Sequence, residues 1–323
     1  MNFKQLIKPA IVLFSLFAVF SVFWLVIKIY GKNIGEIFWK NSSASLIGNE
    51  VLLPKDPEIL QILKPTRDWS VDDIEINAKA TVCAETNSMD KNRYLLKKNE
   101  NEKLPIASLT KLMTALVVLE SENKDYGLEK VTIISQKAVN QQGGQGLLTS
   151  GEILSIKNLL YIMLIESSND AAYSLAELEG VKQFVGLMNL KAVELELSDT
   201  NFKDIAGLSP DNYSTVEDLL KLTKYLLEKH PLVWEILSSD KFRLITPQGK
   251  FHHQLLSTNE LLGVIPNIVG GKTGETIEAM GCLLLVLKNP ENQNYLIYII
   301  LGSNDRFGEM QKLINWVNSA YKW

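Results

Sequence analysis

The stretch Leu104-Pro-Ile-Ala-Ser-Leu-Thr-Lys-Leu-Met-Thr-Ala-Leu116 places a serine and a lysine three residues apart at the start of an apolar helical pattern. Pro105 indicates that the chain is not yet inside a helix, and apolar residues follow Ser108 at helical spacing. Ser108 is therefore expected in the first turn of a buried helix, with Lys111 one turn along. A lysine with desolvated neighbours loses part of its preference for the protonated form. Lys111 can then act as the general base that makes Ser108 a nucleophile.

The spacing of serine and lysine is a weak signal by itself, because solvated pairs of these residues are common. The same spacing occurs at Ser88/Lys91, Ser121/Lys124, Ser238/Lys241 and Ser319/Lys322. Only the pair at Ser108 and Lys111 precedes a long apolar helical pattern. This context favours the catalytic interpretation there.

A second polar element, Ser167-Ser168-Asn169, lies between two apolar helical patterns. A polar triplet in that place can contribute to a site, although serine and asparagine are also favoured helix caps. The third element, Lys272-Thr273-Gly274, falls on an expected strand whose hairpin partner is the apolar run 282–287. Glycines around it leave the strand edge free for a ligand or another backbone. The order S-x-x-K, S-x-N, K-T-G indicates a serine acyl-transfer site.

Composition excludes several other classes of function. The 323 residues carry a net charge of −4 with mixed signs, and no basic stripe indicates nucleic-acid binding. Cys83 and Cys282 lie far apart in apolar runs, so buried free thiols are expected; a disulfide remains open. The histidines (His230, His252 and His253) have no metal-ligand spacing and are expected to be structural. We expect no metal and no cofactor.

The N-terminus predicts a membrane anchor. No charged residue occurs between Lys8 and Lys28, and 11–27 is nearly all apolar, which is about the length that crosses a bilayer. A cleaved signal peptide would end in small residues, and this run ends in Phe23-Trp-Leu-Val-Ile27. We expect residues 1–30 to be a cytoplasmic tip and transmembrane helix, and residues 31–76 a linker with a possible short helix at 57–63. Lysines on both sides of the span leave its orientation open.

Residues 77–323 are expected to form one α+β domain. Two strands, 80–85 and 94–97, form a hairpin around residues 87–90, and a mostly helical segment follows from 106 to about 237. Strands return at 270–272, 282–287 and 295–301, and a last helix covers 310–321. The strands from both ends should make one antiparallel sheet, with the helical lobe inserted and the site between them.

These motifs and their flanking residues resemble the low-molecular-mass D-alanyl-D-alanine carboxypeptidases, which are penicillin-binding serine peptidases with a β-lactamase-like fold. The resemblance rests on 104–116, on Gly151-Glu-Ile-Leu-Ser155 with Ser168-Asn-Asp-Ala-Ala172, on Gly207-Leu208 with Tyr213-Ser-Thr215, and on Gly271-Lys-Thr-Gly274. It covers roughly residues 77–323.

The resemblance implies that Ser108 attacks the terminal D-Ala-D-Ala bond of a peptidoglycan stem peptide and that Lys111 is its general base. Ser167 would relay a proton to the leaving D-alanine, and Asn169 would orient Lys111 and the substrate amide. Lys272, Thr273 and Gly274 would bind the terminal carboxylate along the strand edge. The backbone N–H groups of Ser108 and Glu275 would form the oxyanion hole. β-Lactams are the implied inhibitors, and the substrate places the domain outside the cytoplasm, on a single-pass anchor in the cytoplasmic membrane.

The chain departs from the family pattern directly after Lys-Thr-Gly. Glu275 stands where an aromatic residue or histidine is common, and Met280 where glycine is usual. The family often adds an arginine after the last strand to bind the carboxylate, and Arg306 is the candidate here.

Three alternative functions remain open. A β-lactamase shares the fold and motifs, but the class A enzymes need a glutamate in an E-x-x-L-N stretch, which we do not find. A DD-transpeptidase or endopeptidase would use the same residues with another acyl acceptor or substrate. A catalytically silent cell-wall-binding protein would not need the complete set of Ser108, Lys111, Ser167, Asn169 and Lys272.

Overall fold

The computed structural model describes residues 65–323 except 87–91, 122 and 144–145. The expected anchor, the possible helix at 57–63 and the tip of the first hairpin lie outside these residues. In the described part of the chain, no helix has both the length and the apolar character needed to cross a bilayer.

The compact unit that contains the described residues starts at Pro65 rather than at residue 77. The short strand β1 (Thr66–Arg67) pairs with β13 (Tyr321–Lys322) at the other end of the chain. The Arg67 guanidinium lies 5.1 Å from the centre of the Trp316 ring. Residues 65–76 therefore belong to the folded unit, and the predicted linker is too long at its C-terminal end.

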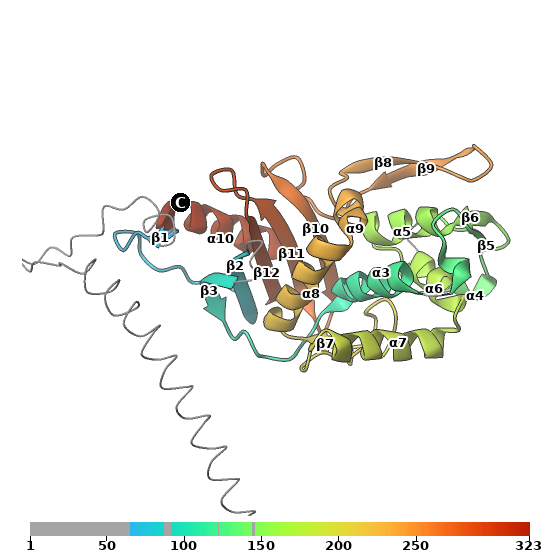
Figure 1. The fold of residues 1–323 in the computed structure, drawn as a ribbon, viewed down its shortest axis with the longest axis horizontal. Coiled ribbons are helices and arrows are strands. Elements are labelled where there is room, and N and C mark those ends of the chain that lie inside the picture. The colour runs from blue at the N-terminus through green and yellow to red at the C-terminus, as the bar shows by residue number, and fades with distance from the viewer. Residues whose placement is uncertain (1–64, 87–91, 122, 144–145) are drawn as a thin grey trace, which may run out of the picture. The chain divides into compact units, whose positions relative to one another are not determined.

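The central sheet has five antiparallel strands in the order β10-β11-β12-β2-β3 (Figure 1). Its strands are β2 (Ala80–Thr86), β3 (Asn92–Lys98), β10 (Ile268–Thr276), β11 (Met280–Lys288) and β12 (Tyr295–Ser303). The strands from the two ends of the domain meet where β2 pairs with β12. The predicted α+β layout, with one sheet built from both ends, is confirmed.

Each face of the sheet packs on a different hydrophobic cluster, because successive side chains on a strand point to opposite faces. On β2, Val82 packs in the larger cluster with the helical lobe, and its neighbour Cys83 packs in the smaller cluster with α10 (Arg306–Ala320). On β11, Leu284 and Leu285 divide in the same way. The alternation fixes the register of the sheet, since a slip of one residue would exchange the two faces.

The helical lobe forms between β3 and β10, as expected, and α3 lies in its interior (Figure 1). Residues 111–118 of α3 are all buried, and α3 contacts α5, α6 and α7. The helices of the lobe are α3 (Lys111–Glu120), α4 (Gln136–Val139), α5 (Ile156–Ile165), α6 (Asn169–Glu177), α7 (Val181–Glu194), α8 (Val216–Lys229) and α9 (Pro231–Leu237), with 3-10 turns η1 (Ala107–Thr110) and η2 (Lys124–Tyr126). Burial of α3 on all sides holds its N-terminus, and therefore the Ser108 region, in place.

Short strand pairs complete the lobe, and none of them was expected from the sequence. The pairs are β4 (Leu104–Pro105) with β7 (Tyr213–Ser214), β5 (Val131–Ile133) with β6 (Ile153–Ser155), and β8 (Lys241–Ile245) with β9 (Phe251–Leu256). The unexpected β8–β9 hairpin carries His252 and His253, which bond to Glu152 and Glu166 at 3.0 and 3.1 Å. These contacts give both histidines structural partners, as predicted.

Candidate active site

Ser108 lies in η1, directly before α3, at the junction of the helical lobe and the sheet. Its side chain is half-buried, and the residue before it, Ala107, has a φ of +46°. A positive φ is unfavourable for alanine and is maintained only where the surroundings determine it. Gly207 supplies that constraint: a Cβ at Gly207 would lie 1.9 Å from the Ala107 carbonyl oxygen. The close approach of these two backbones fixes the turn that presents Ser108.

The amine of Lys111 is fully buried and makes three hydrogen bonds. Its Nζ lies 2.7 Å from Ser108 Oγ, 2.7 Å from Asn169 Oδ1 and 2.9 Å from the Ala206 carbonyl oxygen. Burial lowers the pKa of Lys111 to about 7, although the negative charge of Asp204 acts in the opposite direction. A neutral amine has two hydrogens and one lone pair. Because Asn169 Oδ1 and the Ala206 carbonyl can only accept, they take the two hydrogens and leave the lone pair for the Ser108 hydroxyl.

The turn between α5 and α6 positions Ser167 and Asn169. Ser168 caps α6 by accepting a hydrogen bond from the Ala171 backbone N–H, and Ser167 has a φ of +62°. Asn169 donates through Nδ2 to the Gln142 carbonyl, which fixes Oδ1 toward Lys111. Ser168 therefore caps the helix, while Ser167 and Asn169 contribute their side chains to the site.

Lys272 connects the sheet edge to the helical lobe. Its amine is fully buried and donates to Ser167 Oγ at 2.7 Å and to the Thr273 carbonyl at 2.9 Å. Burial, together with the nearby positive charges of Lys111 and Arg306, holds the pKa of Lys272 well below its usual value. A bound anion would oppose both effects, so the site favours an anionic ligand next to Lys272.

Two further contacts fix the strand edge beside Ser108. A Cβ at Gly274 would lie 3.0 Å from the Ser108 backbone nitrogen, so β10 approaches the nucleophile closely at that point. The Thr273 hydroxyl lies 2.6 Å from the Thr258 hydroxyl. If Thr258 donates in this contact, Thr273 keeps its own hydrogen for a ligand.

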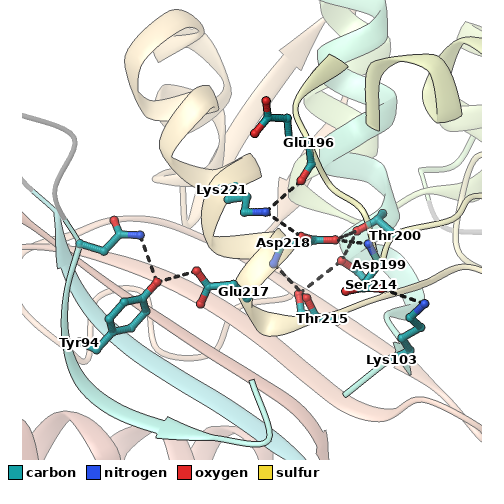
Figure 2. Close-up of polar contacts among 11 residues, drawn as sticks. Tyr94, Lys103, Glu196, Asp199, Thr200, Ser214, Thr215, Glu217, Asp218 and Lys221 are labelled. Carbon is teal, nitrogen blue, oxygen red and sulfur yellow. Dashed lines mark hydrogen bonds and ion pairs between the residues drawn. The ribbon is translucent and has the colours of Figure 1, made fainter. Parts of the chain in front are cut away.

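The loop that supplies the Ala206 carbonyl is organised around Asp204. The Asp204 carboxylate accepts hydrogen bonds from four backbone N–H groups, those of Ala206, Gly207, Leu208 and Ser209. The ends of the loop are held at the start of α8, where Asp218 Oδ2 accepts from the Asp199 N–H and the Thr200 hydroxyl (Figure 2). Thr215 caps the same helix by accepting from the Asp218 N–H. The second acceptor for Lys111 is thus built into a rigid loop.

Glu275 and Arg306 lie at the end of the site, and their side chains bind each other. Glu275 follows Gly274 on β10 and is exposed, and Arg306 is the first residue of α10. An Arg306 nitrogen donates to Glu275 Oε2 in an ion pair. Asp170, next to Asn169, is also titratable, and burial raises its pKa to about 6.

The structure brings the predicted site residues together in two hydrogen-bonded groups, Ser108–Lys111–Asn169 and Ser167–Lys272. Thr273 and Gly274 follow Lys272 on β10. The sequence reasoning did not single out Asp204, the Ala206 carbonyl or Thr258. The spacing of Asp204 and Gly207 is typical of a turn in which the aspartate side chain accepts backbone hydrogen bonds, and this pattern is the one that could have indicated the loop. Cys83 and Cys282 are buried free thiols, as predicted, and the described residues contain no cluster of three or more histidine, cysteine or acidic side chains suited to a metal.

A fold with one antiparallel sheet and an inserted helical lobe, with two serines that each bond to a buried lysine, defines the class of penicillin-binding serine peptidases. The chain belongs to the D-alanyl-D-alanine carboxypeptidase family of peptidases (S11), whose family model matches residues 67–305.

Relatives of the chain carry several names within this family. It is 31% identical over 252 residues to the D-alanyl-D-alanine carboxypeptidase DacF of Bacillus subtilis, covering 76% of this chain and 63% of DacF. It is 39% identical over 216 residues to a D-alanyl-D-alanine endopeptidase of Haemophilus influenzae, covering 66% of this chain and 72% of the relative. The crystal structure of the Streptomyces K15 DD-transpeptidase matches with a TM-score of 0.69 at 26% identity, covering 77% of this chain and 100% of that one. The chain thus spans less than two thirds of DacF, and of the Escherichia coli carboxypeptidase DacC it spans 58%.

Proposed function

We propose that the protein is a serine D-alanyl-D-alanine carboxypeptidase that removes the terminal D-alanine from peptidoglycan stem peptides through an acyl-enzyme on Ser108. The observation that carries this proposal is the hydrogen-bonding arrangement of Lys111. Two carbonyl acceptors take both hydrogens of the neutral amine, so its lone pair faces the Ser108 hydroxyl at 2.7 Å. This is the arrangement that a general base needs in order to activate a serine.

Acylation begins when Ser108 Oγ attacks the carbonyl carbon of the penultimate D-alanine and Lys111 takes the hydroxyl proton. The carbonyl oxygen becomes negatively charged and accepts hydrogen bonds from the backbone N–H groups of Ser108 and Glu275. The close approach of Gly274 to the Ser108 nitrogen supports this oxyanion hole. Loss of one such donor typically costs about 10²–10³ in rate.

The carbon–nitrogen bond then breaks, and the leaving D-alanine takes a proton from Ser167. Because Lys272 donates to Ser167 Oγ, the hydrogen of the Ser167 hydroxyl is free to move to the leaving nitrogen. The proton that Lys111 took from Ser108 replaces the one that Ser167 gives up, so Lys111 is neutral again and Ser167 is again a hydroxyl. Lys272 and the Thr273 hydroxyl hold the carboxylate of the leaving residue. Water then attacks the ester on Ser108 and releases the shortened peptide.

Incubation of the full chain with a labelled penicillin tests the proposal. We expect a covalent adduct on Ser108 that forms in a 1:1 ratio and is released slowly, together with D-alanine release from a pentapeptide. The Ser108→Ala variant should give neither signal. Rapid turnover of the drug would instead identify a β-lactamase, and an absence of any adduct would identify a silent binder. Both reactions release D-alanine, so cross-linked product in place of the hydrolysed tetrapeptide would identify a transpeptidase.

We also propose that residues 1–30 anchor the protein in the cytoplasmic membrane as a single-pass helix, with the catalytic domain outside the cytoplasm. The uncharged apolar run at 11–27 and the extracytoplasmic location of peptidoglycan support this arrangement. Digestion of intact spheroplasts with an external protease should then degrade the catalytic domain. Full protection of the domain until the membrane is broken would contradict the proposed orientation.

A further inference from the structure

The ion pair between Glu275 and Arg306 lies beside the proposed carboxylate-binding edge. Thr273 and Glu275 are two residues apart on β10, and side chains at that spacing project to the same face of a strand. Two residues of a strand span about 7 Å. The Glu275 carboxylate is therefore a fixed feature of the surface that continues from the Thr273 hydroxyl.

The guanidinium of Arg306 is mostly enclosed, whereas its partner is not. The Arg306 side chain is 19% exposed and the Glu275 side chain is 67% exposed. Arg306 Nε is buried without a hydrogen-bond partner in the described structure, and the guanidinium lies 4.9 Å from the centre of the Phe307 ring. The positive charge of Arg306 thus depends on Glu275 as its counter-ion.

This pairing has a consequence for ligands that carry a negative charge. A ligand carboxylate at Lys272 and Thr273 must compete with Glu275 for the Arg306 guanidinium, because that guanidinium already has an anionic partner. An uncharged group at the same place needs no cation and is not affected by this competition.

We propose that Glu275 is a specificity-determining residue: by engaging Arg306 it weakens, without abolishing, the binding of a free carboxylate directly beyond the scissile bond. The enzyme then accepts substrates in which that group is uncharged, such as a carboxamide or a peptide that continues, alongside D-Ala-D-Ala peptides. The proposal rests on the proposed acyl-transfer function, because it assumes that Lys272 and Thr273 receive the group beyond the scissile bond. The Glu275 side chain acts on binding, whereas its backbone N–H belongs to the proposed oxyanion hole and is kept in Glu275→Gln.

Two peptides that differ only in the last group test the inference: one ends in D-Ala-D-Ala with a free carboxylate, the other in the corresponding carboxamide. The measured quantity is the ratio of kcat/KM for the carboxylate to kcat/KM for the carboxamide, obtained with the full chain. In Glu275→Gln we expect this ratio to rise about three- to tenfold, mainly through a lower KM for the carboxylate, because the released Arg306 guanidinium then attracts that carboxylate near water. The difference should shrink in high salt, because the group is exposed.

Glu278→Gln is the matched control, because Glu278 is an exposed acid in the turn directly after β10. It should leave the ratio unchanged. An unchanged ratio in Glu275→Gln would overturn the inference, and a lower ratio would do so as well, since it would mean that Glu275 positions Arg306 to bind the carboxylate. Labelled penicillin distinguishes failure of this inference from failure of the proposed function. If neither the wild-type protein nor the variants form the Ser108 adduct, the proposed function has failed.

Discussion

Lowering the pH from about 8 to about 5 should slow acylation of Ser108 about 100-fold, because it protonates Lys111. Burial lowers the pKa of this amine from 10.5 to about 7. A drop of about 3.5 in pKa corresponds to about 5 kcal/mol against the charged form. The amine is therefore mostly neutral at pH 8 and about 1% neutral at pH 5.

The sign of the effect follows from the role of the base. Only the neutral amine has a lone pair for the Ser108 proton, so the rate should rise tenfold for each pH unit below 7 and level off above it. The second-order rate constant for formation of the labelled penicillin adduct measures this directly, under conditions where the drug is in excess. The penicillin carboxylate stays ionised throughout the range and does not contribute to the profile.

Asp170 provides the control, because burial raises its pKa to about 6, close enough to confuse the assignment. In Asp170→Asn the midpoint near pH 7 should persist if Lys111 carries it. A profile that varies less than about threefold between pH 5 and pH 8 would refute the reasoning, as would a midpoint that disappears with the Asp170 carboxylate.

Three further substitutions examine the parts that support the site. Asp204→Asn should lower the free energy of unfolding by about 1.5–3 kcal/mol, because an amide cannot accept all four backbone hydrogen bonds, and it should move the Lys111 midpoint to lower pH. A higher midpoint would contradict this. Gly207→Ala should lower the unfolding free energy by about 2 kcal/mol or more, because the new methyl would lie 1.9 Å from a backbone oxygen. Gly180→Ala is the control, since Gly180 also has a positive φ but has open space around it, and it should cost less. Equal losses in the two variants would exclude the contact as the cause. Thr258→Val should reduce kcat/KM for a D-Ala-D-Ala peptide about three- to tenfold through a higher KM, with unchanged stability. An unaltered KM would show that the contact between the Thr258 and Thr273 hydroxyls does not position the ligand.

The central sheet could be predicted because its strands leave a strong local pattern. Strands β11 and β12 are buried on both faces, so their sequences are nearly continuous apolar runs between turn residues. The β8–β9 hairpin leaves no such pattern. Most of its side chains are exposed or half-buried, and the strands are short and contain charged and polar residues. Its position depends on contacts of His252 and His253 with distant segments.

The start of the folded unit was missed for a related reason. Strand β1 has two residues, and two residues carry no period that a sequence pattern can reveal. What holds 65–76 in the unit is a set of contacts with the last helix and strand, for example the Arg67 guanidinium against Trp316 and Tyr321. Proline-rich, polar sequence before residue 77 is compatible with a linker unless these distant partners are known.

The catalytic pair could be predicted from spacing, but the chemistry of its base could not. Ser108 and Lys111 are one helical turn apart, so their contact is local. The acceptors that determine which hydrogens the amine donates lie 58 and 95 residues further along the chain, at Asn169 and Ala206. Without both carbonyls, a buried lysine could donate to Ser108 instead of accepting from it, and the same motif would have no base. The motif therefore identifies the nucleophile, whereas the Asp204 loop and the α6 cap give Lys111 the orientation in which a proton can move to it.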